Sequence, residues 1–152
     1  MRTTHPIEAA DVRLLRSLAE LDYDLVRAYE TAISKLDDDI VRNGLREIVD
    51  DHRRHLYDLN DEITDLGGNA WVEEDFRHVL ERGKVFLASL IGDRRIVKAL
   101  LHDEDEVSEA YARATTSLIL APRIRRMLDD HLDDDRKHRS WLDRTMHVLD
   151  AD

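Results

Sequence analysis

Three ionisable side chains occupy positions that a helix should fill with apolar ones, in the stretch from His131 to Leu142. Positions 124, 128, 131, 135, 138 and 142 follow one another by three or four residues, which is the spacing of the buried face of an amphipathic helix. His131, Asp135 and His138 occupy three of these positions in a row. Because an unpaired ionisable group in a protein interior costs several kcal/mol, other groups there must satisfy them. The chemistry to consider is therefore metal binding or a network of buried ion pairs.

This stretch belongs to the last of four long helices that the hydrophobic periodicity predicts. The helices are expected from Ile7 to Leu36, from a cap at Asp37–Asp39 to about Leu66, from an N-cap at Asp93 to Leu118, and from Pro122 nearly to the C-terminus. In the connection of residues 67–92, a shorter helix with an apolar face is expected between Phe76 and Leu90. The fold class predicted from these elements is all-α.

Polar side chains also interrupt the apolar face of each of the first three helices. They are Asp22 in the first helix, His52 and His55 in the second, and Glu104 in the third. Asp22 and His52 each lie about fifteen residues from the first turn, or ~22 Å at the usual helical rise. Glu104 and Asp135 lie at similar distances from the last turn. All four helices are therefore expected to present polar side chains in one layer of the interior.

The four buried faces match in pairs, which indicates an internal repeat. At a constant offset, the first and third helices pair Leu15 with Val97, Leu18 with Leu100, Asp22 with Glu104, Leu25 with Val107, Tyr29 with Tyr111, Ala32 with Ala114 and Leu36 with Leu118. The second and fourth helices pair Leu45 with Leu128, His52 with Asp135, His55 with His138 and Leu59 with Leu142. The chain is therefore interpreted as two helical hairpins of the same kind, joined by a long connection.

Length and composition narrow the class of protein. The chain has 152 residues and a formal net charge of −11. Its length indicates a single domain spanning residues 1–152, and its charge argues against nucleic acid or an anionic membrane as a partner. It contains no cysteine, which excludes disulfides, thiolate metal sites and a thiol nucleophile. Without a signal peptide or an apolar run of the ~20 residues that a membrane span needs, a cytoplasmic protein is expected.

The motif around Asp135 resembles the fourth helix of bacterioferritins, because it reads Asp135-x-x-His138-x-x-Trp141-Leu-Asp. Asp22 and Glu104 are each followed by a tyrosine seven residues later, which is similar to helices of rubrerythrin type. As a whole the chain resembles the ferritin-like superfamily, and within it the small uncharacterised or stress-associated bacterial four-helix proteins. The resemblance implies an antiparallel four-helix bundle with a long crossover that contains an extra helix. It also implies a di-iron or di-manganese site, in which two helices supply one Glu each and two supply Glu-x-x-His.

Carried onto this sequence, the resemblance implies metal ligands at Asp22, His55, Glu104, Asp135 and His138. The sixth position is a departure, because His52 stands where the superfamily has a Glu that bridges both metals. An imidazole cannot bridge two metals through one nitrogen, so Glu104 is the expected bridge. Asp51 is a possible substitute for His52 as a ligand. Tyr29, Tyr111 and His131 are expected to contact the ligand side chains and not the metal itself.

The first functional hypothesis is a non-haem dinuclear metal protein that contains two iron ions, although mixed imidazole and carboxylate ligands also accept zinc or manganese. Its chemistry would be ferroxidase-like or peroxide-reducing, with dioxygen or peroxide as the oxidant and a role in oxidative stress. A homodimer is expected. Whether the protein is an enzyme stays open at this point.

The second hypothesis belongs to a different class. A metal-free or zinc-binding helical bundle would use the polar layer to fix helix register and would act, in a stress-related role, through self-association or a protein partner. Its contact surface would be the helix between Phe76 and Leu90, or apolar positions such as Leu14, Leu21 and Val26.

Overall fold

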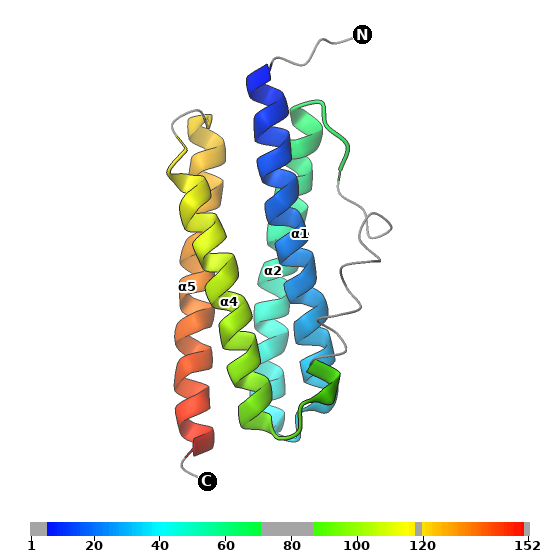
Figure 1. Cartoon of the computed structure of the whole chain (residues 1–152), viewed down its shortest axis with the longest axis vertical. Coiled ribbons are helices and arrows are strands. Elements are labelled where there is room, and N and C mark those ends of the chain that lie inside the picture. Colours follow the sequence, from blue (N-terminus) through cyan, green and yellow to red (C-terminus); the bar gives the residue numbers. More distant parts are fainter. Residues whose placement is uncertain (1–5, 71–86, 118–119, 151–152) are drawn as a thin grey trace.

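Four long helices make up most of the described chain, and they pack side by side (Figure 1). The computed structural model describes residues 6–70, 87–117 and 120–150. The helices are α1 Pro6–Lys35, α2 Asp39–Asp65, α4 Asp93–Thr115 and α5 Pro122–Asp150. No strand occurs within these described ranges, which confirms the all-α prediction.

The helices form two antiparallel hairpins, α1 with α2 and α4 with α5 (Figure 1). The hairpins meet where α1 packs against α4 and α2 against α5. Since α2 and α4 run in the same direction, the end of α2 and the start of α4 lie at opposite ends of the molecule (Figure 1). The shorter helix predicted between Phe76 and Leu90 falls mostly on residues 71–86, which lie outside the described residues. Residues 87–89, the part of this connection described just after them, are helical.

Local chemistry sets the two ends of α2 as the sequence predicts. Asp38 caps its start by accepting hydrogen bonds from the backbone N–H groups of Ile40 and Val41 at 2.7 and 3.0 Å. After its last turn, Gly67 adopts a positive φ of 82°, a conformation that glycine reaches without steric cost. These features fix the length of α2 and therefore the depth of the side chains that it carries.

The prediction that Asp93 caps α4 is wrong. Gly92 is the N-cap, and Asp93 is the first helical residue. The carboxylate of Asp93 instead accepts hydrogen bonds from the backbone N–H groups of Asp37 and Asp38 at 3.1 and 3.0 Å. It therefore fastens the start of α4 to the turn between α1 and α2, which is a tertiary contact that a local capping rule does not anticipate.

Apolar side chains from all four helices meet in one core. The predicted buried faces are confirmed along α1, along α4 as far as Ala114 and along α5 as far as Leu142. In α2 the face turns after Leu59, so that Ile63 is fully buried while Glu62 is half-buried and forms an ion pair with Arg123 at 2.9 Å.

Among the described residues, no helix combines the length and the apolar composition that crossing a membrane would demand.

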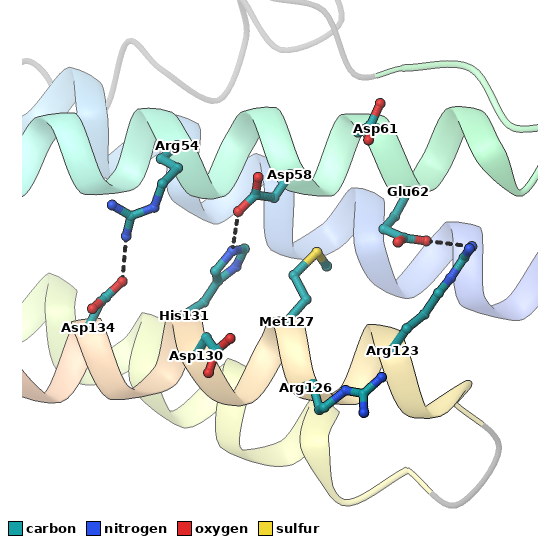
Figure 2. Close-up of a pocket in the computed structure, with 10 residues that line it drawn as sticks. All are labelled: Arg54, Asp58, Asp61, Glu62, Arg123, Arg126, Met127, Asp130, His131 and Asp134. Carbon is teal, nitrogen blue, oxygen red and sulfur yellow. Dashed lines mark hydrogen bonds and ion pairs between the residues drawn. The ribbon is translucent and has the colours of Figure 1, made fainter.

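A charged groove of about 550 Å³ lies between α2 and α5 (Figure 2). Arg54 of α2 forms an ion pair with Asp134 of α5 across the groove. His131 of α5 lines it, and its Nε2 lies 3.0 Å from a carboxylate oxygen of Asp58 of α2. Polar contacts therefore add to the apolar core in joining one hairpin to the other.

Gly44 lets α2 and α5 approach closely. A Cβ atom at this position would collide with the ring of Trp141 in α5. Glycine in a helix interior costs about 1 kcal/mol relative to alanine, so the close packing of the indole explains why a glycine occupies this position.

We expect Gly44→Ala to lower the free energy of unfolding by about 1–3 kcal/mol, because overpacking against Trp141 outweighs the gain in helix propensity. Urea unfolding followed by circular dichroism measures the change. In a Trp141→Leu background the same Gly44→Ala change should be neutral or stabilising. A loss of equal size in both backgrounds would contradict the assigned contact.

Candidate metal centre

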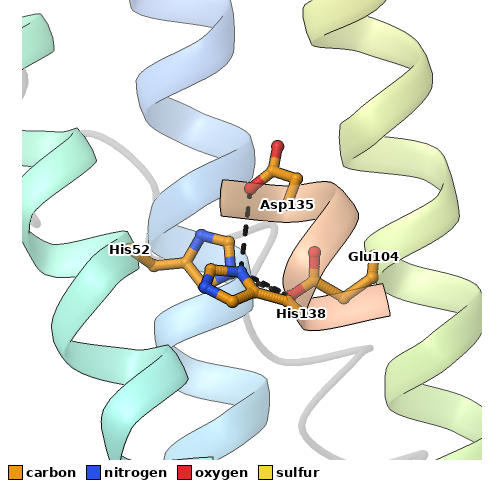
Figure 3. A group of neighbouring side chains, drawn as sticks. All are labelled: His52, Glu104, Asp135 and His138. Carbon is orange, nitrogen blue, oxygen red and sulfur yellow. Dashed lines mark hydrogen bonds and ion pairs between the residues drawn. The ribbon is translucent and has the colours of Figure 1, made fainter. Parts of the chain in front are cut away.

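Six polar side chains meet in the interior, and they are the six predicted ligands. Asp22, His52, His55, Glu104 and Asp135 have no exposed surface, and His138 is 5% exposed. They form two groups whose possible ligand atoms lie within 4.8 Å of one another, namely His52, Glu104, Asp135 and His138 (Figure 3), and Asp22, His52 and His55. Either group can hold a metal ion, and His52 belongs to both.

His52 lies between two carboxylates. Its Nδ1 is 2.8 Å from Oδ1 of Asp22 in α1, and its Nε2 is 2.9 Å from Oε1 of Glu104 in α4. Burial opposes a charge on His52, but Glu104 and Asp22 outweigh it and raise the pKa of His52 well above its usual value. Burial likewise opposes a charge on Glu104, yet His52 and His138 lower the pKa of Glu104 to about 2. Without a metal, the centre of the layer is therefore an imidazolium between two carboxylates.

Asp135 lies in the same layer without such partners. Neither of its oxygens has a hydrogen bond among the described residues. Burial and the negative charge of Asp22 raise the pKa of Asp135 to about 9. Its Oδ1 is 3.9 Å from Nδ1 of His55 and 3.9 Å from Nδ1 of His138. An acid that must stay protonated in the interior is costly, so its presence points to a bound cation that the protein would hold there.

The outer nitrogens of two histidines are held by aspartates on the facing helix. Nε2 of His138 donates to Asp51 at 2.8 Å, and Nε2 of His55 donates to Asp134 at 3.3 Å. Arg54 forms ion pairs with both aspartates. These contacts fix the tautomer of each ring and leave Nδ1, with its lone pair, facing the interior.

The sequence does not predict these two contacts, because it suggests Asp51 only as a substitute ligand and indicates no role for Asp134. A signal was present, because each aspartate comes directly before a polar position of the layer, His52 or Asp135, at equivalent places in the repeat. The structure places Asp51 against the outer nitrogen of His138, on the far side of the ring from the other ligands.

The tyrosines of the repeat make crossed contacts. Tyr29 of α1 donates a hydrogen bond to Glu104 of α4 at 2.6 Å, and Tyr111 of α4 donates one to Asp22 of α1. Both hydroxyls are fully buried, and burial together with the neighbouring carboxylate raises the pKa of each tyrosine well above its usual value. Two neutral phenols therefore orient the two carboxylates.

His131 breaks the symmetry of the repeat, because its equivalent in α2 is Ile48. The ring of His131 stacks on that of His55 with centroids 4.0 Å apart, and its Nδ1 lies 3.3 Å from the hydroxyl of Tyr111. Since Nε2 reaches Asp58 in the groove, His131 connects the buried layer to the surface on one side only. It contacts the predicted ligand His55 and belongs to neither group of possible ligands.

Several atoms of the layer lack a hydrogen bond, and they lie close together and are of similar chemical types. Besides both oxygens of Asp135, the atoms without a hydrogen bond include Nδ1 of His55, Nδ1 of His138 and Oε2 of Glu104. The side chains of Glu104, Asp135 and His138 lie next to one another in the layer (Figure 3), and Nδ1 of His55 lies 3.9 Å from Oδ1 of Asp135. Imidazole nitrogens and carboxylate oxygens are the donors that iron, manganese and zinc accept. The residues present therefore fit a metal, and the carboxylate that faces both inner histidines is Asp135 rather than the expected bridge, Glu104.

Replacing the carboxylic acid of Asp135 by an amide should stabilise the metal-free protein against unfolding. A pKa raised from 3.8 to about 9 means that folding takes up a proton, so this part of the stability is present below pH 4 and is lost as the pH rises toward 9. In protein treated with chelator, we expect Asp135→Asn to unfold at higher urea than the wild type at pH 8 and to lose this advantage near pH 4. Asp133→Asn, on the exposed side of α5, is the control. Parallel pH profiles for Asp135→Asn and wild type would contradict the assignment.

Comparison with known proteins adds a family match. A family model described as "Domain of unknown function (DUF2383)" matches residues 11–117. The match covers α2 and α4 and most of α1, and with them Asp22, His52, His55 and Glu104, and it ends before α5 begins. A comparison with curated proteins finds no match.

Proposed function

We propose that this chain, which belongs to the DUF2383 family, is a non-haem metal protein of ferritin-like four-helix architecture that holds two cations, iron above all, in its buried layer. The observation that carries the proposal is the set of buried donors without hydrogen bonds, Asp135 foremost among them. In a folded interior such atoms are normally satisfied. Cations bound in the two groups of possible ligands would satisfy these atoms.

Iron is the metal that we favour among those that the donors accept. Three imidazoles and three carboxylates make a mixed nitrogen and oxygen site, which suits iron and also admits zinc or manganese. With two ferrous ions bound, such a site would supply electrons for the reduction of dioxygen or peroxide as the iron is oxidised. We therefore propose ferroxidase-like or peroxide-reducing chemistry.

The chain's own residues would prepare the site for this role. Asp51 and Asp134 hold the outer nitrogens of His138 and His55, so that both rings keep their lone pairs turned inward. Tyr29 and Tyr111 fix the carboxylates by hydrogen bonds, and the apolar core above and below the layer limits the access of water. A first coordination shell held in place in this way has little to reorganise on binding.

A metal-free structural layer is the second candidate. The double hydrogen bond of His52 to Asp22 and Glu104 favours it, because an imidazolium between two carboxylates is already compensated. This reading leaves Asp135 unexplained, since neither of its oxygens has a hydrogen bond among the described residues. A cation accounts for Asp135, so metal binding is the better-supported function.

Anaerobic titration with ferrous iron tests the proposal. We expect the wild type to bind two equivalents and the double variant Asp135→Ala/His138→Ala to lose them. The exposed histidines His102 and His147 provide a matched control, and His102→Ala/His147→Ala should bind like the wild type. Addition of peroxide or air should then oxidise the bound iron, as followed by its absorption. A wild-type protein that binds neither iron nor another divalent cation would leave the structural layer as the function.

The two outer aspartates allow a graded test. We expect Asp51→Ala and Asp134→Ala each to weaken metal binding by about 10- to 100-fold, because each frees the outer nitrogen of one histidine ligand. Asp50→Ala and Asp133→Ala change the neighbouring aspartates, which face solvent, and should have little effect. Competition with a chelator of known affinity measures the change. Equal effects in both pairs of variants would indicate that overall charge, and not ring orientation, is responsible.

A further inference from the structure

At one pair of equivalent positions in the repeat, His52 and Asp135, the two candidate ligands are side chains of different chemical type. Asp22 corresponds to Glu104 in the repeat, and both are carboxylates. His55 corresponds to His138, and both are imidazoles. Only His52 and Asp135 combine an imidazole with a carboxylate at equivalent positions of the two hairpins. The layer therefore has two similar halves with one unlike pair between them.

The two halves have the same geometry around His52. On one side, Oδ1 of Asp22 lies 2.8 Å from Nδ1 of His52 and 3.5 Å from Nδ1 of His55. On the other side, Oε1 of Glu104 lies 2.9 Å from Nε2 of His52 and 3.5 Å from Nδ1 of His138. Each nitrogen of His52 thus belongs to its own cluster of one carboxylate oxygen and one further imidazole nitrogen.

The other two histidines of the layer cannot play this double part. The Nε2 atoms of His55 and His138 are engaged by Asp134 and Asp51 at the outer edge, so each ring offers only Nδ1 to the interior. His52 is fully buried and turns both nitrogens toward other candidate ligands. Among these three rings it alone has two nitrogens in the layer.

We propose that His52 bridges two divalent cations through its two ring nitrogens, one cation with Asp22 and His55 and the other with Glu104 and His138. The inference rests on the proposed function, because it specifies how the same layer divides between two ions. Each ring nitrogen has one lone pair and binds one cation, and the two ring protons pass to solvent as the cations enter.

Asp135 completes the arrangement. Its Oδ1 is 3.9 Å from the inner nitrogen of His55 and equally far from that of His138, so it faces both halves. Both of its oxygens lack hydrogen bonds, which leaves them available to either ion. An imidazole ring between the ions keeps them farther apart than a shared carboxylate oxygen would, and this sets the site apart from a pair of metals joined by a Glu at the same position.

Nuclear magnetic resonance of the full chain tests the bridge without any chemistry at the site. The protein is labelled with nitrogen isotope in its histidines, freed of metal with chelator and loaded with a spin-active isotope of cadmium. We expect scalar coupling to cadmium at both nitrogens of His52, and at Nδ1 alone for His55 and His138. Correlations to ring carbons assign the signals, and their loss in His52→Gln confirms the assignment. With cadmium bound, coupling at only one nitrogen of His52, or at neither, would overturn the bridge and leave the proposed function intact. A protein that binds neither cadmium nor ferrous iron would overturn both.

Substitutions at equivalent positions of the two hairpins test the same proposal independently. In cadmium titrations, Asp22→Asn and Glu104→Gln should each weaken one of two binding steps by about tenfold or more and leave the other near its wild-type affinity. His52→Gln should weaken both steps together. A His52→Gln protein that keeps one step at wild-type affinity would show that His52 serves a single cation.

Discussion

The structure depends on one constraint, the cost of keeping ionisable side chains in an interior that excludes water. Among the described residues, eight acidic or histidine side chains are buried, and six of them meet in a single layer. The apolar residues above and below the layer position the helices, but the layer decides their register, because a shift of one residue would move a charge into the apolar core or an apolar group into the polar layer. The fold and the candidate site therefore depend on each other.

The repeat explains how four helices deliver matched donors to one place. Each hairpin supplies a carboxylate from its first helix and a polar pair, three residues apart, from its second. When the hairpins pack with α1 against α4 and α2 against α5, the tyrosine of each first helix reaches the carboxylate of the other, and the histidine of each second helix reaches an aspartate of the other. Two pairs of equivalent positions differ in residue type, namely His52 with Asp135 and Ile48 with His131. These differences give the two halves different properties.

Much of this could be predicted from sequence, because burial in a long helix follows from spacing alone. The shared depth of Asp22, His52, Glu104 and Asp135 followed from counting residues to the turns. Contacts that depend on how two helices cross could not be predicted in this way. The spacing does not show that Asp51 and Asp134 reach across to the outer nitrogens, that Asp93 holds the turn between α1 and α2, or that Asp135 and not Glu104 faces both inner histidines. Such contacts are set by the angle and distance between helices, which Gly44 and Trp141 help to fix.

Anomalous diffraction from crystals loaded anaerobically with ferrous iron would locate any bound metal. We expect two peaks in the buried layer, one on each side of the ring of His52, with Asp135 turned toward them. An interior without peaks, in which His52 stays hydrogen-bonded to both Asp22 and Glu104 at saturating iron, would contradict this expectation.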